Sequence, residues 1–285
     1  MSTLYVVATP IGNLGDMSPR AIETLKSVSL IAAEDTRVTM KLCNHFGIET
    51  PLTSCHQHNE KGKSGTIVQR MLAEEIDVAV VTDAGTPAIS DPGTYIVKEA
   101  AAAGIPVIAV AGPSAMAAAM SVSGFDITEF TFCGFLPREN KELKEKLIDL
   151  ARKTPCAIVH ESPYRVKELV QAITSTLPGA RISASCDLTK LHELTIRGSA
   201  EEVLAMLEGN EKSDKGEYCL VLDLRAVTLP EEKTVNTDIS VEARLFEKML
   251  NGMEMRDAMR ELQDEGEKKN RVYAASLKLK AFFEE

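Results

Sequence analysis

Three stretches of the chain combine glycine, proline and small polar residues in a way that suits a ligand pocket. They are residues 9–16 (TPIGNLGD), 82–93 (TDAGTPAISDPG) and 111–115 (AGPSA). Small residues let main-chain amides approach a ligand closely, and prolines stiffen the surrounding wall. One such stretch can equally be an ordinary turn between a strand and a helix. Three of them, after successive strands, favour a pocket.

Five titratable side chains are candidates for chemistry. They are the adjacent acids Glu34 and Asp35, the loop histidines His56 and His58, and Lys190. A carboxylate or an imidazole can act as a base, and a lysine ammonium can stabilise a developing alkoxide. Each also has an ordinary structural explanation: an acid pair at a helix start, a solvated loop, or a surface lysine.

Several site classes are excluded by motif spacing. The chain has neither G-x-x-x-x-G-K-[ST] nor G-x-G-x-x-G after a strand, which disfavours ATP and NAD. Its six cysteines, at positions 43, 55, 133, 156, 186 and 219, form no C-x-x-C pair. Zinc-ribbon, iron–sulfur and thioredoxin motifs therefore fail, and we expect no metal site. Scattered thiols are typical of a reducing cytosol, so we expect a cytoplasmic protein.

Composition places the chain among ordinary globular proteins. Its 285 residues are 44% hydrophobic and 26% charged, and at roughly 150 residues per domain they predict about two domains. The net charge of −10 gives no support for general DNA binding, which depends on Lys and Arg. The uncharged stretch 100–125 contains glycine, proline and many alanines, so we expect no membrane span.

The order of apolar and amphipathic segments predicts an α/β fold. In the first half, apolar runs typical of buried strands occupy residues 4–8, 30–33, 78–81 and 106–110. Because these runs alternate with helices, they indicate a parallel sheet covered on both faces. In the second half, strands are predicted at 130–133, 156–160 and 218–224. In such folds ligands bind beyond the carboxyl ends of the strands, where the three stretches lie.

Local signals also mark helix ends and a separate tail. Ser18 before Pro19 predicts a helix start, and Gly47 predicts a left-handed helix end. Residues 226–236 are polar and predict a linker, after which only helices are expected. The cations of this tail without an intervening acid are Lys268, Lys269, Arg271, Lys278 and Lys280. Such a run is either an RNA contact surface or a solvated helix face.

Six sequence blocks together resemble a known family. They are VATPIGNLGD, IAAEDTR, HQHNE, VTDAGTPAISDPG, AGPSA and GFLPR, in this order. The set resembles the ribosomal RNA small-subunit methyltransferase I family, which has the tetrapyrrole-methylase (class III) fold of S-adenosylmethionine-dependent enzymes. The resemblance covers essentially residues 4–225, and the helical tail is also similar. The DAGTPAISDPG run and the block order are specific, whereas GPSA alone is not.

The resemblance implies an architecture and an activity. It implies two α/β/α domains, over residues 1–114 and 115–228, and a small helical region over 237–285 that could contact RNA. The cofactor S-adenosylmethionine would bind in the cleft between the two domains of a homodimer. The reaction would be methylation of a cytidine ribose 2′-hydroxyl in 16S rRNA of the small ribosomal subunit, with neither DNA nor a membrane as partner.

The resemblance also implies functional residues. The implied cofactor-binding residues are Ile11, Asp83, Ala84, Gly85, Thr86, Ile89, Ser114, Ala115 and Glu161. The main chain of residues 83–89 would hold the amino-acid end and the ribose of the cofactor. Asp83 would help to hold a cationic ligand or, equally well, stabilise a turn. Glu34, Asp35 and Lys190 are the catalytic candidates.

One departure from the family pattern weakens the substrate assignment. Cys186 and Asp187 stand where the family usually has Arg-Glu before Leu-Thr-Lys. The change removes a fixed cation and shortens the acid. Two alternatives therefore stay open: a tetrapyrrole (precorrin) methyltransferase, and a non-catalytic RNA-binding assembly factor. The basic tail and the DAGTP loop argue against the first, and the intact pocket loops argue against the second.

Overall fold

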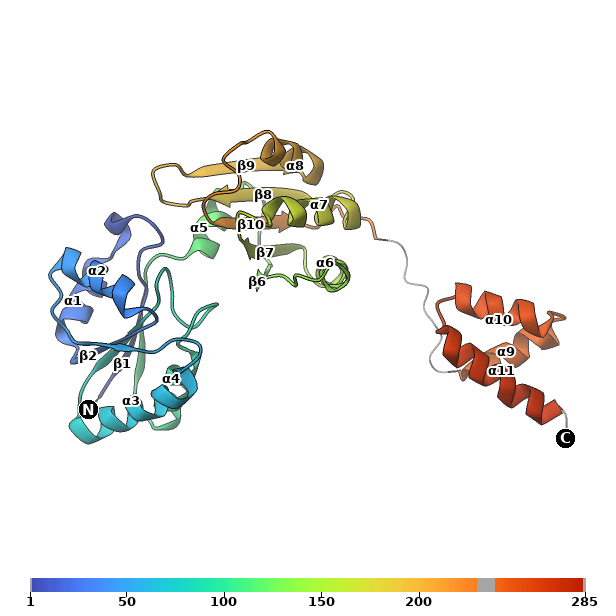
Figure 1. Ribbon diagram of the computed structural model, residues 1–285, viewed down its shortest axis with the longest axis horizontal. Coiled ribbons are helices and arrows are strands. Elements are labelled where there is room, and N and C mark those ends of the chain that lie inside the picture. Colours follow the sequence, from blue (N-terminus) through green and yellow to red (C-terminus); the bar gives the residue numbers. More distant parts are fainter. Residues whose placement is uncertain (1, 230–238, 284–285) are drawn as a thin grey trace. The chain divides into compact units, whose positions relative to one another are not determined.

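The computed structural model describes residues 2–229 and 239–283. The chain divides into two compact units, Met1–Leu229 and Pro230–Glu285 (Figure 1). The first unit contains two five-stranded sheets, and the second contains helices alone in its described part. Among the described residues, no helix is both long and apolar enough to span a bilayer.

The first sheet is wholly parallel. Its strands run in the order β3-β2-β4-β1-β5 and comprise β1 (Leu4–Val7), β2 (Leu30–Ala33), β3 (Leu52–Ser54), β4 (Val78–Val81) and β5 (Val107–Val110). All residues of β2 and β4 are buried, as their continuous apolar sequences predict. Parallel strands place all their carboxyl ends at one edge, so the three stretches of small residues meet there.

Helices cover both faces of this sheet. They are α1 (Pro19–Ser27), α2 (Thr36–Phe46), α3 (Glu60–Glu74) and α4 (Thr94–Ala102), with a 3-10 turn η1 at Leu14–Asp16. One core contains Leu25 and Cys43 from α1 and α2, and the other contains Met71 and Ile96 from α3 and α4. The predicted helix signals are confirmed, because the Ser18 side chain accepts from the amide of Ala21 and Gly47 has a φ of 60°.

The second sheet is mostly antiparallel. Its order is β6-β7-β10-β8-β9, with β6 (Thr131–Phe135), β7 (Cys156–Glu161), β8 (Arg181–Cys186), β9 (Leu194–Ser199) and β10 (Tyr218–Asp223). Only β6 and β7 pair in parallel within it. The apolar pattern does not reveal β8 and β9, because their sequences RISASC and LTIRGS mix serine, arginine and glycine with apolar residues.

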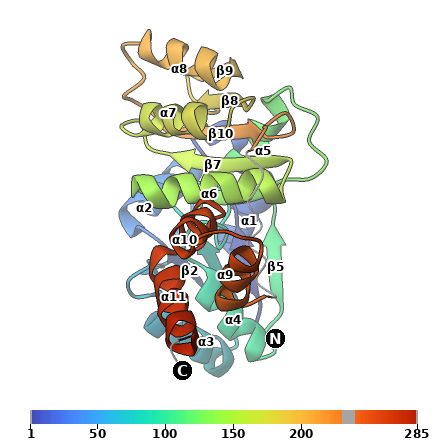
Figure 2. The same cartoon turned by 90° about the vertical axis from the view of Figure 1, so that its right-hand side faces the viewer.

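Four helices accompany the second sheet. Helices α6 (Asn140–Lys153), α7 (Val166–Thr176) and α8 (Ala200–Glu208) lie side by side and share one core with it (Figure 2). Helix α5 (Ala115–Val122) contributes Ala119 to a different core with Ile158 and Val221. Because α5 packs against the second sheet, the chain passes into the second domain at Ala115, the last residue of the AGPSA stretch.

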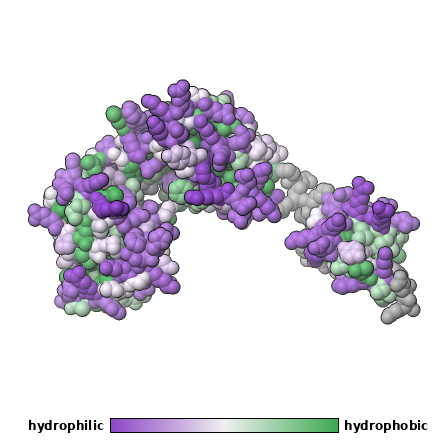
Figure 3. Space-filling view, viewed as in Figure 1, coloured by the Kyte–Doolittle hydropathy of each residue, from purple (hydrophilic) through white to green (hydrophobic). Residues whose placement is uncertain are grey.

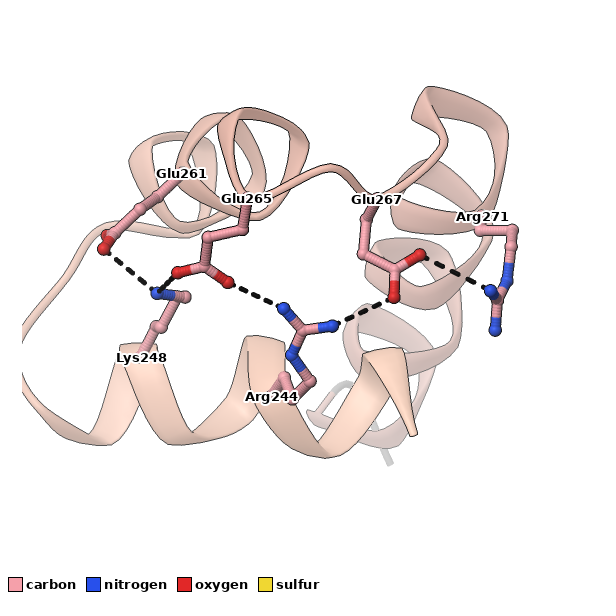
Figure 4. Close-up of polar contacts among 6 residues, drawn as sticks. All are labelled: Arg244, Lys248, Glu261, Glu265, Glu267 and Arg271. Atoms are coloured by element: carbon pink, nitrogen blue, oxygen red, sulfur yellow. Dashed lines mark hydrogen bonds and ion pairs between the residues drawn. The ribbon is translucent and has the colours of Figure 1, made fainter. Parts of the chain in front are cut away.

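The second unit is a three-helix bundle of α9 (Val241–Leu250), α10 (Met255–Asp264) and α11 (Lys269–Phe283). An ionic network joins the helices, with Arg244 contacting Glu265 and Glu267, and Lys248 contacting Glu261 and Glu265 (Figure 4). Hydrophobic side chains also reach its surface between hydrophilic ones (Figure 3). The ion pairs between its helices therefore add to the stability that the small apolar core of this unit provides.

Candidate active site

A hollow lies between the two sheet domains of the first unit, and we call it the interdomain hollow. From the loops after β1, β4 and β5 and the start of α5 it is lined by Ile11, Ala84, Gly85, Thr86, Ile89, Ser90, Asp91, Ser114, Ala115 and Met116. From the second domain it is lined by Phe132, His160, Leu188, Glu217, Tyr218 and Cys219. Residues more than 200 positions apart thus share one site.

Seven of the nine residues expected to bind a cofactor line this hollow. The two that do not are Asp83 and Glu161. Asp83 faces an adjacent hollow instead. Glu161 is 3% exposed, and its carboxylate accepts a hydrogen bond from the amide of Ser162 at 2.7 Å and lies 3.4 Å from Arg165. The side chain that β7 presents to the hollow is that of His160, one residue earlier.

A pair of main-chain hydrogen bonds ties the first two loops together. The amide of Thr9 donates to the carbonyl of Gly85 at 2.8 Å, and the amide of Gly85 donates back at 3.0 Å. Gly85 has a φ of +84°, and a Cβ there would lie 3.4 Å from Ile11. A side chain at this position would be strained and would enter the narrow space beside Ile11.

The rest of the second loop is held in an uncommon backbone conformation. Ala88 has a φ of 65°, and its amide donates to the carbonyl of Pro92 at 3.1 Å. The buried carboxylate of Glu60 accepts from the amides of Gly93 at 2.8 Å and Tyr95 at 2.7 Å. It thereby caps α4, where Gly93 has no side chain to do so. The last residue of the HQHNE block therefore anchors the end of the loop.

The start of α5 offers free donors to the hollow. Ser114 occupies the position before the first helical residue, yet its side chain makes no capping hydrogen bond. The first-turn amides of α5 therefore lack a capping side chain, and such amides favour an anionic group. Because Ser114, Ala115 and Met116 line the hollow, this end of it suits a carboxylate.

An acid that sequence reasoning did not single out also lines the hollow. Burial, with a smaller contribution from the charges of Glu34 and Asp83, raises the pKa of Asp91 to about 6. No donor contacts its carboxylate in the part of the chain that the structure describes. A cation placed beside Asp91 would restore its ionised form. The only sequence signal for this residue was its place in the 82–93 stretch.

Burial also affects the histidine of this site. It lowers the pKa of His160, which therefore stays neutral near pH 7. The His160 ring lies 5.3 Å from the ring of Phe132, in an edge-on arrangement. Together these two rings give the hollow an aromatic wall on the second-domain side.

Glu34 and Asp35 hold the loops and lie outside the interdomain hollow. Glu34 accepts from the hydroxyl of Thr82 at 2.5 Å and from the amide of Asp83 at 3.3 Å. Asp35 caps α2 and pairs with the guanidinium of Arg37 at 2.6 Å. The hydrogen bond from the Arg37 side chain is the main reason that the pKa of Asp35 falls to about 2. A carboxylate with so low a pKa is a poor base.

His56 lies with these two acids in a third, open hollow. That hollow is also lined by Ser54 and Asp83. The His56 ring is 6.0 Å from that of His58, and neither histidine lines the interdomain hollow. The structure therefore brings Glu34, Asp35 and His56 together, but apart from the residues expected to bind the cofactor.

Lys190 stands at the edge of the interdomain hollow as a paired cation. Its Nζ donates to Asp187 and to Glu217, each at 2.9 Å, and Glu217 lines the hollow. Burial acts to lower the pKa of Lys190, but the hydrogen bonds and charges of the two carboxylates outweigh it and raise the pKa. Lys190 is therefore a permanent cation rather than a base. Asp187 keeps an acid beside it despite the departure from the family pattern.

The known proteins that this chain resembles are methyltransferases, as the sequence blocks predict. Residues 3–204 match the family model described as Tetrapyrrole (Corrin/Porphyrin) Methylases. The chain is 40% identical to ribosomal RNA small subunit methyltransferase I of Synechocystis sp., over 99% of both chains. It is 44% identical to the protein of that name from Bacillus subtilis, over 78% of this chain and 75% of the relative.

Solved structures share the fold at low sequence identity. A diphthine synthase superposes with a TM-score of 0.61 at 13% identity, over 78% of this chain and 90% of the other. A uroporphyrin-III C-methyltransferase from Thermus thermophilus, complexed with S-adenyl homocysteine, gives 0.54 at 14% identity, over 77% and 96%. The predicted α/β fold of the tetrapyrrole-methylase type is confirmed.

Proposed function

Because the chain belongs to the ribosomal RNA small subunit methyltransferase I family of tetrapyrrole methylases, we propose that it methylates a cytidine ribose 2′-hydroxyl in 16S rRNA with S-adenosylmethionine. Family membership confirms the resemblance and the enzyme class inferred from the sequence. It favours neither alternative, the precorrin methyltransferase or the non-catalytic assembly factor. The observation that carries the proposal is the interdomain hollow, whose polar groups are left open to a ligand.

The residues of the hollow fit the proposed cofactor. The uncapped amides of α5 suit its carboxylate, and Asp91 suits its positive charge. Gly85 leaves space that a side chain would fill, and Phe132 and His160 supply an aromatic wall. When bound, S-adenosylmethionine supplies a methyl group on a positively charged sulfur.

Positioning and charge are what this chain would contribute to the reaction. A ribose hydroxyl is a weak nucleophile, so holding it in line with the methyl group accounts for much of the proposed acceleration. The Lys190 ammonium would stabilise negative charge that develops on the hydroxyl oxygen. Glu34 and Glu60 act as positioning residues, since they hold the two ends of the 82–93 loop.

The helical unit is proposed to add affinity for the RNA substrate. Of the five cations of the basic run, Arg271 lies 3.5 Å from Glu267 and Lys278 lies 2.7 Å from Glu242. Within the described residues, Lys268, Lys269 and Lys280 have no such partner and remain open to phosphate. Three unpaired cations are enough for a modest contribution to binding.

The proposal also includes a cytoplasmic homodimer that acts on neither DNA nor a membrane. Six free cysteines are consistent with a reducing compartment. Apolar side chains that stay exposed on the first unit, such as Ile108, Val122 and Phe130, are available for a subunit contact. Light scattering after size exclusion tests the dimer, and a monomeric mass would contradict it.

A transfer assay tests the proposed activity. Small subunits lacking the modification, and precorrin in a parallel reaction, are incubated with methyl-labelled S-adenosylmethionine, and the labelled product is identified. We expect label on a cytidine 2′-oxygen. Label on precorrin alone, or cofactor binding without transfer to RNA, would contradict the proposal.

Lys190 is tested in the same assay. Lys190→Ala should lower turnover by at least ~10-fold while cofactor affinity stays within about twofold, because the ammonium acts on the hydroxyl. Lys190→Arg should recover part of the rate. Lys98→Ala, which removes an exposed lysine on α4, serves as the matched control. Equal turnover in Lys190→Ala would remove this residue from the reaction.

A further inference from the structure

A second hollow, which we call the side pocket, adjoins the interdomain hollow. It has a volume of about 240 Å³. The two hollows share their dividing wall, because Ile11 and Ala84 face the interdomain hollow while their neighbours Gly12 and Asp83 face the side pocket. The hydrogen bonds between Thr9 and Gly85 hold this wall together. A ligand in the side pocket would therefore lie next to one in the interdomain hollow.

Four apolar side chains line the side pocket, namely Pro10, Leu14, Val38 and Leu42. The polar side chains that line it are Thr9, Thr39, Lys41, Thr82 and Asp83. Leu14 is 42% exposed and Val38 is 40% exposed, so both present apolar surface that no side chain of the described part covers. Apolar side chains on either side of a gap are typical of sites that hold a single base taken out of a nucleic-acid strand.

The carboxylate of Asp83 is a hydrogen-bond acceptor of the side pocket that is left partly open. An oxygen of Asp83 accepts from the amide of Asp35 at 3.1 Å, and its other oxygen has no partner within residues 2–229 and 239–283. A carboxylate accepts a hydrogen bond from the exocyclic amine of cytosine. Uracil carries a carbonyl at the same position, and a carboxylate would repel it. The side pocket therefore has the chemistry to distinguish these two bases.

Size and surroundings favour a single nucleoside as the occupant. Small-molecule sites occupy about 300–1,000 Å³, and the side pocket lies just below this range. It therefore suits one pyrimidine nucleoside better than a macrocycle. Gly12 also brings Lys190 to the wall, since a Cβ on Gly12 would lie 2.5 Å from Cγ of Lys190. A nucleoside seated here would therefore have the Lys190 side chain on the other side of Gly12.

We propose that the side pocket holds the target cytosine, turned out of the RNA strand, and that Asp83 selects it by accepting a hydrogen bond from its amine. The inference rests on the proposed function, because it assigns the second substrate of that same reaction. It makes Asp83 a specificity residue for RNA rather than a cofactor ligand.

The first test changes the target base of the RNA and the carboxylate of Asp83. The substrate is a small subunit reconstituted with 16S rRNA in which the nucleotide methylated by the unaltered protein is cytidine or uridine. We expect the unaltered protein to prefer cytidine by at least about tenfold in kcat/KM. Asp83→Asn keeps an oxygen for the amide of Asp35 but offers an amine to the base, so the preference should fall to parity or reverse. Cofactor affinity should stay unchanged.

The second test fills the pocket. Val38→Trp should lower turnover by at least about tenfold and leave cofactor affinity unchanged. Met40→Trp is its matched control, because Met40 is exposed on the same helix and does not line the pocket. Full turnover of Val38→Trp, or an unchanged base preference in Asp83→Asn, would overturn this inference while leaving the proposed function standing. Absence of any cytidine 2′-O-methylation by the unaltered protein would overturn both.

Discussion

The polar groups of the helical unit and those of the two hollows differ in what they contact. In the helical unit, Arg244 donates to Glu267 at 2.9 Å and to Glu265 at 2.7 Å, and Lys248 bridges Glu265 and one further acid, Glu261. In the hollows, Asp91 and the second oxygen of Asp83 have no partner among the described residues. Groups that satisfy one another stabilise a fold, whereas groups left open are available to a ligand.

The largest expected effect is on the ionic network of the helical unit. Arg244→Leu would leave the buried carboxylate of Glu267 with Arg271 alone, 3.5 Å away and largely exposed. We expect the free energy of unfolding of this unit to fall by about 3–5 kcal/mol. Hydrogen exchange of its helical amides measures the loss, and cofactor affinity of the first unit should not change. The control Arg256→Leu alters an exposed cation without an ion pair in the described part, and should cost under about 0.5 kcal/mol.

The next effect concerns the space beside Ile11. Gly85→Val should weaken cofactor binding at least ~100-fold, about 2.7 kcal/mol, because it fills that space and strains a residue with φ +84°. Calorimetric titration measures the change. Gly104→Val is the matched control, since Gly104 has a φ of +73° with nothing within 4 Å of its Cβ position. Similar losses of affinity in both variants would show that backbone strain, not the hollow, is responsible.

A pH dependence should separate Asp91 from the paired acids. Its folded-state pKa of about 6 lies above the usual 3.8, so Asp91 is protonated below pH 6 and ionised above it. The stability that its raised pKa contributes is present at acid pH and lost as the pH rises through 6. Cofactor affinity should change in the opposite sense and increase between pH 5 and 7, because the ionised acid attracts the cationic ligand. Asp91→Asn should flatten this increase, whereas Asp83→Asn should keep it and shift it to slightly lower pH, because the charge of Asp83 contributes to the raised pKa of Asp91.

The smallest effect is expected from the unpaired lysines of the basic run. The substitutions Lys269→Ala and Lys280→Ala should each reduce the salt dependence of RNA binding by about 0.7–0.9 in log–log slope, as the loss of one phosphate contact does. Lys278→Ala should change the slope less, because Lys278 already pairs with Glu242 at 2.7 Å. Filter binding at several salt concentrations measures the slopes. Equal slopes for all three variants would show that the ion pair with Glu242 does not keep Lys278 from contacting phosphate.

Much of the fold could be predicted because its signals are local. The apolar runs at β2 and β4, the Ser18 cap and the left-handed Gly47 depend on residues only a few positions apart. The second sheet was harder to predict from the sequence. Its strand β8 contains Ser183 and Ser185, which are buried only because other strands and helices cover them. No pattern within six residues signals that kind of burial.

Part of the candidate site could also be predicted from local sequence, and part depends on contacts between distant residues. The glycine and proline stretches pointed to the loops, and Gly85 is a residue type that tolerates the positive φ found there. The pairing of Lys190 with Glu217 joins residues 27 positions apart, and it decides that this lysine acts as a cation. The sequence shows five cations in the basic run. Only the packing of the helices shows that two of them, Arg271 and Lys278, already face acids.

The sequence by itself determined the apolar strands of the first sheet, the helix ends at Ser18 and Gly47 and the loop that borders the hollows, because propensity, capping and glycine geometry act over a few residues. Only the tertiary structure decided which acid faces which hollow. Asp91 and Asp83 lie on one loop, and their directions depend on the anchor from Glu60 at one end and Glu34 at the other. Those contacts span 33 and 49 positions, so no local pattern encodes them.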